Sequence, residues 1–346
     1  MLLKERVMVG MSGGIDSSFA AYLLKKEGYE VVGASFLLAP SMGEEDAYRA
    51  RDVAESLGIE HHIIDLREEF REEVINRFVK EYQEGRTPNP CIVCNKFIKF
   101  GSFFREAKKL EADIIATGHY ASIEKLDGRF VLKTPKDEKK DQTYFLYNLK
   151  EVDLKNILFP LAAYDKKYIK EKSQEIGLKS IERESFEICF VSNDDIGAFL
   201  EDYTKKPLVP GNIVDNSGYI LGRHKGIENY TIGQRRGLGV ATGKRVFVTE
   251  INPEKNQVTL GDEEDLFKKR IIAKDINFIG SLPIGSFKAE GKARYQMPKS
   301  PCYAEIVGDR LEIEFEDMVR APTKGQSVVL YEGDRLLGGG IIELVC

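Results

Sequence analysis

The sequence predicts an α/β protein in which a doubly wound, parallel-sheet domain is followed by a small β-rich middle domain and a C-terminal β-barrel. Two observations predict this order. In the first half of the chain, short apolar runs alternate with helical patterns. Beyond residue 205, alternating apolar and polar runs are separated by Gly, Asp, Asn and Pro turns. At 346 residues the chain also exceeds the usual domain size of roughly 100–200 residues.

The N-terminal elements follow from hydrophobic periodicity. Residues 6–12 form a short apolar run, 16–28 a helical pattern closed by Gly28, and 29–38 a second apolar run, which together predict a βαβ unit. The same alternation continues, and the pattern from 136 to 206 is largely helical. The further helices are expected at 45–58 and 68–85, and the further strands at 61–66 and within 112–122.

Changes in the residue pattern divide the chain into three predicted domains. Prolines, glycines and a turn-like Asp215–Gly218 follow residue 205, and the later strands are predicted at 245–251, 256–261, 310–316 and within 327–344. We expect a catalytic domain at 1–205, a middle domain at 206–273 and a barrel at 274–346.

Composition limits the function classes. With 51 Lys and Arg against 56 Asp and Glu, the net charge is −5, so any nucleic-acid contact must be a local basic groove. No apolar run approaches the roughly 20 residues that span a bilayer, and no signal peptide is visible, so we expect a cytoplasmic protein without membrane contact. Five cysteines in such a chain favour thiol chemistry or metal binding over disulfides.

The stretch GMSGGIDSS, residues 10–18, lies between the first predicted strand and helix. Backbone N–H groups at a helix start attract phosphate, and Gly13 and Gly14 allow close approach. Ser12 and Ser17 add hydroxyl groups, and Asp16 can help to hold Mg²⁺ beside the phosphates. The Walker lysine pattern and GxGxxG are both absent. SGGxDS resembles the signature of the PP-loop ATP pyrophosphatases, which activate a substrate oxygen by adenylation.

Cys91 and Cys94 form a CxxC pair, and Cys189 lies far along the chain. A CxxC alone can be a redox pair, half of a zinc site or two ligands of an iron–sulfur cluster. Cys302 and Cys346 match no motif, and we expect them to be structural or incidental.

A set of motifs in order makes the resemblance specific. SGGIDSS, PNPCxxCNxxIKFG, ATGHY, KDQTYFL, EICF and YTIGQRRGLG resemble the tRNA-specific 2-thiouridylases over nearly the whole chain. That family replaces the oxygen at carbon 2 of the wobble uridine with sulfur. The resemblance implies a PP-loop (adenine nucleotide alpha hydrolase-like) fold, ATP and Mg²⁺, the anticodon stem-loop of tRNA as partner, and a sulfur donor such as a cysteine desulfurase or sulfur-relay protein.

The resemblance also assigns residues. It implies that Cys94 is the nucleophile and Cys189 the persulfide carrier. The ATP contacts that it implies are Gly10, Met11, Ser12, Gly13, Gly14, Ile15, Asp16, Ser17, Phe36 and Gly118. The tRNA contacts that it implies, or that we place beside Cys94 as a pocket for an extruded uridine, are Asn89, Pro90, Cys91, His119, Lys140, Asp141, Gln142, Arg294, Tyr295 and Gln326.

One departure leaves the sulfur chemistry open. Many family members carry Asp where this chain has Cys91, so the general acid or base is unassigned here. Cys91, Cys94 and Cys189 together could hold a 4Fe-4S cluster instead of acting through a persulfide. A PP-loop amidotransferase or ligase acting on a small molecule shares the first motif but does not need three placed cysteines. An RNA-binding protein with a vestigial loop would not need Asp16 and the serines.

Overall fold

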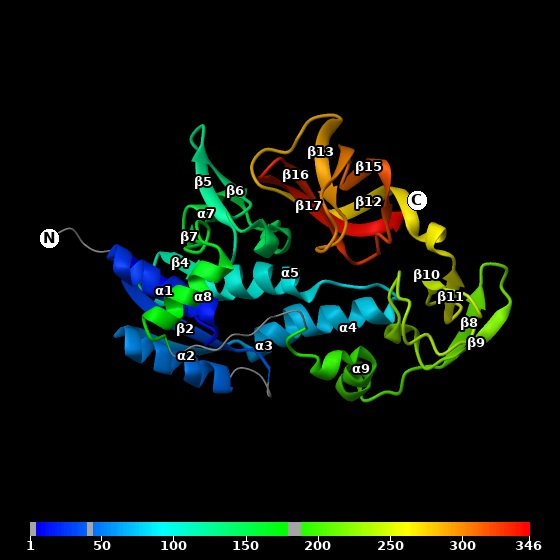
Figure 1. The fold of residues 1–346 in the computed structure, drawn as a ribbon, viewed down its shortest axis with the longest axis horizontal. Coiled ribbons are helices and arrows are strands. Elements are labelled where there is room, and N and C mark those ends of the chain that lie inside the picture. Colours follow the sequence, from blue (N-terminus) through cyan, green and yellow to red (C-terminus); the bar gives the residue numbers. More distant parts are fainter. Residues whose placement is uncertain (1–4, 40–43, 179–187) are drawn as a thin grey trace.

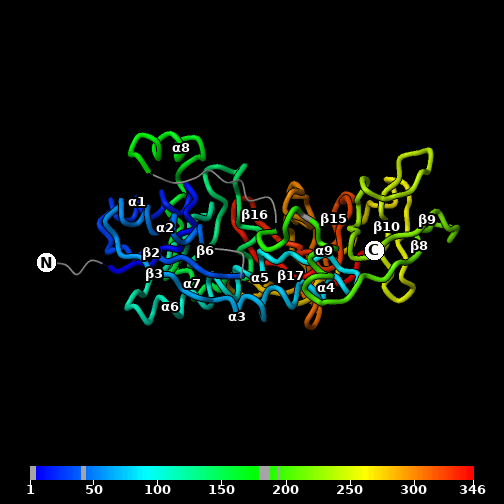
Figure 2. Tube along the Cα trace, turned by 90° about the horizontal axis from the view of Figure 1, so that it is seen from below, coloured from blue at the N-terminus to red at the C-terminus, as the bar shows by residue number. Residues whose placement is uncertain are grey.

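The computed structural model describes residues 5–39, 44–178 and 188–346 (Figure 1). An α/β domain and a small middle sheet lie at opposite ends of the molecule, with a β-barrel between them on one side. Figure 2 shows the same separation from below. The predicted fold class is confirmed. In the described ranges, no helix is both long enough and apolar enough to cross a bilayer.

The α/β domain is built on a five-stranded parallel sheet in the order β3-β2-β1-β4-β7. Its central strand β1 is apolar and buried from Val7 to Val9, and Val7 pairs with Val31 on one side and Ile114 on the other. The bounds are β1 Arg6–Gly10, β2 Glu30–Leu37, β3 Glu60–Asp65, β4 Ile114–Thr117 and β7 Ile157–Leu158. The strand β7 lies within the stretch predicted to be largely helical. Two residues are too few to show the alternation of apolar and polar residues that identifies a strand in a sequence.

Helices cover the sheet and join its strands. Gly28, in the left-handed region at φ 97°, ends α1, and the Asp165 side chain accepts the Tyr168 N–H at the start of α8. The bounds are α1 Ile15–Glu27, α2 Glu44–Leu57, α3 Arg67–Phe70, α4 Asn76–Gln83, α5 Pro90–Cys94, α6 Phe103–Lys109, α7 Glu151–Leu154, α8 Lys166–Glu175 and α9 Ile196–Thr204. Two π-helical stretches, η1 Arg71–Ile75 and η2 Asn95–Ser102, continue α3 into α4 and α5 into α6.

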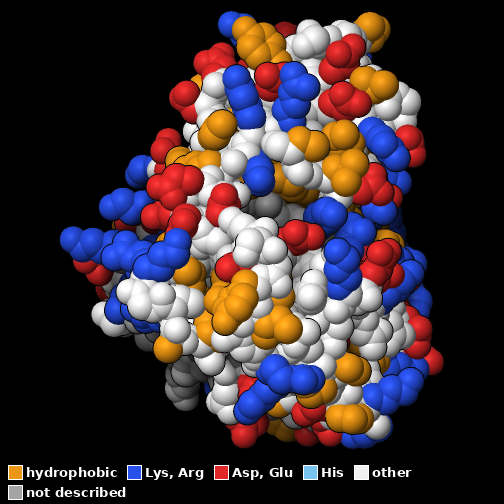
Figure 3. All heavy atoms as spheres, turned by 90° about the vertical axis from the view of Figure 1, so that its right-hand side faces the viewer, with side chains coloured by type: hydrophobic (Ala, Val, Ile, Leu, Met, Phe, Trp, Pro, Cys, Tyr) orange, Lys and Arg blue, Asp and Glu red, His pale blue; other side chains and the backbone are white. Residues whose placement is uncertain are grey.

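The middle domain is a four-stranded sheet in the order β10-β11-β8-β9, with β11 and β8 parallel. Its bounds are β8 Gly211–Asp215, β9 Ile220–His224, β10 Phe247–Asn252 and β11 Gln257–Gly261. On the face of the molecule at this end, Lys and Arg side chains are interspersed with Asp and Glu (Figure 3). This mixture is consistent with the small net charge of the protein. A basic surface that binds nucleic acid would therefore have to be confined to a small region.

Six strands close into the barrel, because β12 pairs with β15 on one edge and with β17 on the other. The bounds are β12 Phe267–Phe278, β13 Phe287–Lys292, β14 Ser300–Val307, β15 Arg310–Arg320, β16 Ser327–Glu332 and β17 Arg335–Val345. The strand β12 runs across the expected join at residues 273 and 274, so the barrel begins before that position.

The barrel and the α/β domain share a hydrophobic core. A hairpin of the α/β domain, β5 Ser122–Leu126 and β6 Arg129–Lys133, pairs with β17 through Leu132 and Leu336. The segment after it packs buried Tyr144 and Tyr147 into the same cluster as Tyr331 of the barrel. The two bodies are therefore held by apolar burial and by strand pairing.

Because the α/β domain and the barrel share this core, removal of a large buried side chain from it should destabilise the protein. Tyr331 is fully buried, so Tyr331→Ala should lower the free energy of unfolding by about 3–5 kcal/mol, as removal of a large buried aromatic ring does. Denaturant unfolding followed by circular dichroism measures this. Tyr303→Ala, which removes an exposed ring from the same barrel, is the control and should cost far less. Equal losses in both variants would contradict a core shared at Tyr331.

Candidate active site

The glycine-rich loop lies where the sequence predicts, between the carboxyl end of β1 and the start of α1. Gly13 has φ +73°, and a Cβ there would lie 3.0 Å from the Asp46 carbonyl oxygen. At Gly118, just after β4, a Cβ would lie 2.8 Å from the Ser17 backbone nitrogen. Only glycine fits at either position. The loop is therefore in close contact with its neighbours. The N-cap residue of α1, Gly14, has no side chain to bond the first N–H groups of the helix, so a ligand can bind there.

The hydroxyl groups of the loop bond to the loop itself. Ser17 Oγ accepts the Ser12 N–H at 3.1 Å and donates to the Gly14 carbonyl at 3.1 Å. Ser18 Oγ also donates to the Gly14 carbonyl, at 2.9 Å. These bonds hold the loop in one shape before any nucleotide binds.

Asp16 is the loop's charged residue, and both of its oxygens are paired. Lys166 Nζ at the start of α8 lies 2.7 Å from each carboxylate oxygen, and the Tyr120 hydroxyl donates to Oδ1 at 2.8 Å. Tyr120 is fixed in turn by Gln142, which accepts the Tyr120 N–H through its side chain and donates its own N–H to the Tyr120 carbonyl. A cation at Asp16 would have to displace or join Lys166.

The CxxC pair lies on a short helix whose start is well defined. The Asn89 side chain accepts the Cys91 N–H at 3.2 Å, and Pro90 occupies the first helical position. Cys94 is buried and Cys91 is exposed. The helix then continues as the π-helix η2, so that Lys99, five residues after Cys94, lies above it along the helix. In an α-helix, a residue five positions after Cys94 would point about 140° away from Cys94 around the helix axis.

Cys189 lies between two residues that pack against the cluster containing Cys94. Ile188 and Phe190 pack against the buried cluster that contains Cys94. The Phe190 ring centroid lies 5.6 Å from that of Phe70 and 5.1 Å from that of Phe78. A charge on Cys189 contributes to the raised pKa of Cys94.

Phe36 joins this cluster to the ATP loop. Its ring atoms lie 3.7 Å from where a Cβ on Gly10 would be, and its centroid is 4.8 Å from that of Phe103. Phe36 also packs against the buried cluster around Cys94. The carboxyl end of β2 therefore forms a wall between the ATP loop and the cysteines.

The three thiols are poor nucleophiles in this resting arrangement. Cys94 is buried, and desolvation raises its pKa to about 12. Cys91 and Cys189 are exposed residues, but desolvation by the surrounding protein also raises the pKa of Cys91 and raises that of Cys189 to about 11. The positive charge of Lys99 opposes this rise at each thiol. Lys99 has no ion-pair partner among the described residues. It is the cation that favours a thiolate here.

The candidate tRNA residues of the α/β domain are largely engaged within the protein. His119 is buried, lies 2.7 Å from Thr117 Oγ1 through Nδ1, and has a strongly lowered pKa because burial disfavours its charged form. Buried Asp141 accepts the N–H and hydroxyl of Thr143. Gln142 fixes Tyr120 as described, and Lys140 is half-buried.

The candidate tRNA residues of the barrel meet at a junction of the three domains. Half-buried Arg294 donates to the Ile232 carbonyl of the middle domain at 2.9 Å and to Thr323. The Tyr295 ring lies 4.4 Å from that of Phe145 in the α/β domain. Gln326 donates to the Thr87 carbonyl, just before Asn89, at 2.8 Å.

Three residues of the site escaped sequence reasoning. Lys166 lies 150 residues from Asp16, and no local pattern connects them. Tyr120 and Lys99 stand inside the quoted motifs ATGHY and IKF, but their direction depends on the strand end and on the π-helix. A motif can mark such residues without showing what they face.

Among the described residues, which include all five cysteines, no three His, Cys, Asp or Glu side chains are grouped so as to hold a metal ion.

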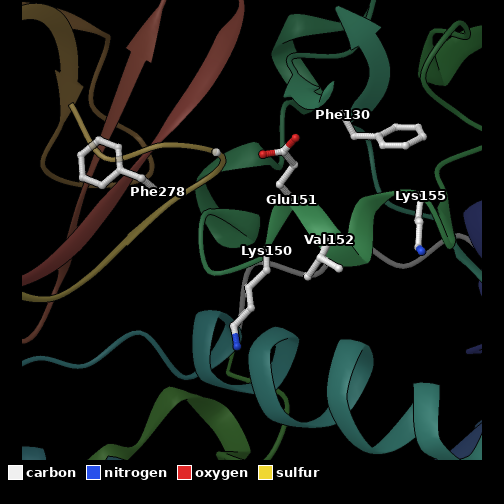
Figure 4. A pocket seen from close by; sticks show the side chains of 7 residues that line it. Phe130, Lys150, Glu151, Val152, Lys155 and Phe278 are labelled. Carbon is white, nitrogen blue, oxygen red and sulfur yellow. The ribbon is translucent and has the colours of Figure 1, made fainter. Parts of the chain in front are cut away.

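A separate pocket opens between α7 and the barrel, where Glu151 lies between the rings of Phe130 and Phe278 in the close view (Figure 4). None of the predicted site residues lines that pocket.

The raised thiol pKa values predict the pH dependence of alkylation. An ordinary thiol of pKa 9.0 gains little reactivity above pH 10, whereas Cys94 and Cys189 should still gain at pH 10–11, because only the thiolate reacts. Timed iodoacetamide labelling with peptide mass spectrometry resolves each cysteine.

Lys99→Met should slow labelling of Cys94 at every pH below the plateau, because it removes the opposing cation. Lys96→Met, on the exposed face of the same π-helix, is the matched control. Labelling of Cys94 that levels off by about pH 10 in the native protein, as for an ordinary thiol, would show that the thiol is not desolvated.

The chain is similar to known protein families and curated proteins over nearly its whole length. Family models match residues 5–193 as a tRNA methyl transferase HUP domain, 197–262 as its PRC-barrel domain and 268–342 as an aminomethyltransferase beta-barrel domain. The chain is 49% identical to tRNA-specific 2-thiouridylase MnmA 1 of Clostridium tetani, covering 99% of this chain and 98% of the relative. It is 46% identical to tRNA-specific 2-thiouridylase MnmA of Clostridioides difficile, covering 99% of both chains. Because the family models and these full-length relatives match nearly the whole chain, it belongs to the tRNA-specific 2-thiouridylase family.

Proposed function

We propose that this protein catalyses the ATP-dependent 2-thiolation of the wobble uridine in the anticodon stem-loop of tRNA. The observation that carries the proposal is that Ile188 and Phe190, on either side of Cys189, pack against the apolar cluster that contains Cys94, with Phe36 joining that cluster to the glycine-rich loop. Adenylation and sulfur transfer need these two centres side by side. The family membership supports the same activity.

The first step uses the loop. The open start of α1 and the backbone of Gly13 and Gly14 hold the phosphates of ATP, and the uridine oxygen at carbon 2 attacks the α-phosphate with loss of pyrophosphate. Lys166 can move its charge from Asp16 to the phosphates, which frees the Asp16 carboxylate for the Mg²⁺ that accompanies ATP. AMP on oxygen then becomes the leaving group.

The second step uses the thiols. A persulfide on Cys189 attacks carbon 2 through its terminal sulfur, and AMP leaves. The Cys94 thiolate then attacks the Cys189 sulfur, which releases 2-thiouridine and leaves a Cys94–Cys189 disulfide. A thiol reductant restores the pair. The sulfur itself comes from a donor such as a cysteine desulfurase or a sulfur-relay protein, in the cytoplasm.

A 4Fe-4S cluster would need three cysteine ligands that converge on it. The described residues form no group of three His, Cys, Asp or Glu side chains that could hold a metal ion, which supports the persulfide route. Cys91 is exposed at the start of α5, and we propose that it lies beside the entry of the target base. We therefore assign the sulfur transfer to Cys94 and Cys189 alone.

The activity is tested by product analysis. Protein incubated anaerobically with ATP, a persulfide donor and tRNA lacking the modification should yield 2-thiouridine, detected by mass spectrometry after digestion. Cys94→Ser and Cys189→Ser should each lower the product at least about a hundredfold, as loss of a reacting nucleophile does. Cys302→Ser, which alters a thiol buried in the barrel, should leave it unchanged.

Failure to form 2-thiouridine with correctly folded protein would refute the assignment. ATP cleavage supported by a small carboxylate in place of tRNA would indicate a PP-loop ligase instead. Product that depends on bound iron, and that is lost in Cys91→Ser together with that iron, would overturn the persulfide route.

A further inference from the structure

A short loop of the barrel lies against the segment that leads into the reacting cysteines. This loop joins β15 to β16, and its end comprises Lys324, Gly325 and Gln326. The Thr87 N–H donates to the Lys324 carbonyl at 2.9 Å, and Gln326 Nε2 donates to the Thr87 carbonyl at 2.8 Å. Thr87 is thus bonded on both its backbone groups. We call these contacts the Thr87 clamp.

The backbones of Gly325 and Thr87 lie so close together that a side chain at position 325 would not fit between them. Gly325 has φ +89°, in the left-handed region, and a Cβ there would lie 3.1 Å from the Thr87 nitrogen, carbonyl carbon and oxygen. Gln326 also reaches toward the Pro88 carbonyl, at 3.4 Å. The backbone of the two segments is therefore in direct contact.

The clamped residues connect stiffly to the cysteines. Pro88 and Pro90 each fix one backbone angle, and Asn89 between them caps α5 by accepting the Cys91 N–H. A displacement of Thr87 is thus passed to the start of the helix that carries Cys91 and Cys94. The chain between the clamp and Cys91 has little freedom to absorb it.

The same barrel loop is held from its other side by the middle domain. Thr323 bonds to Arg294, whose guanidinium donates to the Ile232 carbonyl at 2.9 Å. A Cβ on Gly233 would lie 3.1 Å from the Ala321 Cβ, so these backbones are also close. The loop therefore connects both C-terminal domains to the cysteine segment.

We propose that Gln326, together with Gly325, is a positioning residue that sets the place of Cys91 and Cys94 relative to the extruded uridine. Its side chain acts on the reaction through Thr87 and not through the RNA. The inference rests on the proposed function and deepens it, because it gives the barrel a part in the chemical step in addition to tRNA binding.

The test separates positioning from RNA contact. Gln326→Ala and Gln326→Glu both remove the donor to the Thr87 carbonyl. Each should lower kcat for thiolation at saturating tRNA by about tenfold to a hundredfold, as a misplacement near 1 Å can, with the Kd for tRNA within about twofold of the unaltered protein. Lys324→Ala is the matched control, since Lys324 offers only its carbonyl to the clamp and its side chain is exposed. It should leave kcat unchanged.

Two measurements on free protein need no activity. In both Gln326 variants, hydrogen exchange of the Thr87 amide and iodoacetamide labelling of Cys91 should change, while Lys324→Ala matches the unaltered protein. A weakened tRNA Kd with unchanged kcat would overturn the proposal in favour of direct RNA contact. Unchanged exchange, labelling and kcat would also overturn it. If the unaltered protein forms no 2-thiouridine while the exchange and labelling effects appear, the proposed function fails and the clamp stands.

Discussion

The packing of Ile188 and Phe190 against the buried aromatic rings of Phe70 and Phe78 is the contact on which the rest of the site depends. It carries Cys189 to Cys94 across a long separation in sequence. Ile188 and Phe190 are partly buried, so each contributes a fraction of the roughly 1.5–3 kcal/mol that full burial of an apolar side chain provides. Without it, neither thiol has a partner at the ATP loop.

The same burial that assembles the thiols also keeps them protonated. Desolvation raises the pKa of Cys94 to about 12, and a single half-buried cation, Lys99, acts against it. The π-helix directs that lysine onto the cysteine face. An enzyme that handles a reactive sulfur gains from thiols that ionise only when substrate and charge are in place. The paired Asp16 and Lys166 give the nucleotide loop a comparable resting state.

Local patterns account for the parts of the molecule that sequence reasoning predicted. The β1–loop–α1 unit could be predicted because periodicity, glycines and the Gly28 stop all lie within one short stretch. The hairpin β5–β6 joins the barrel through Leu132 and Leu336, and the partner strand lies some 200 residues away. The pairing of β7 with β4 and the Asp16–Lys166 ion pair likewise join segments that are far apart in the sequence. Which face Lys99 or Gln326 presents depends on tertiary contacts that composition and spacing do not encode.

The central claim is that the Cys94 and Cys189 sulfurs lie within reach of each other in the folded protein. Treatment of the reduced native protein with dibromobimane, a short dithiol cross-linker, followed by peptide mass spectrometry measures this directly. A Cys94–Cys189 cross-link that forms in native protein, and is lost after unfolding in urea, is the predicted result. Cross-linking of Cys189 in the native state only to Cys346, with none to Cys94, would contradict the account.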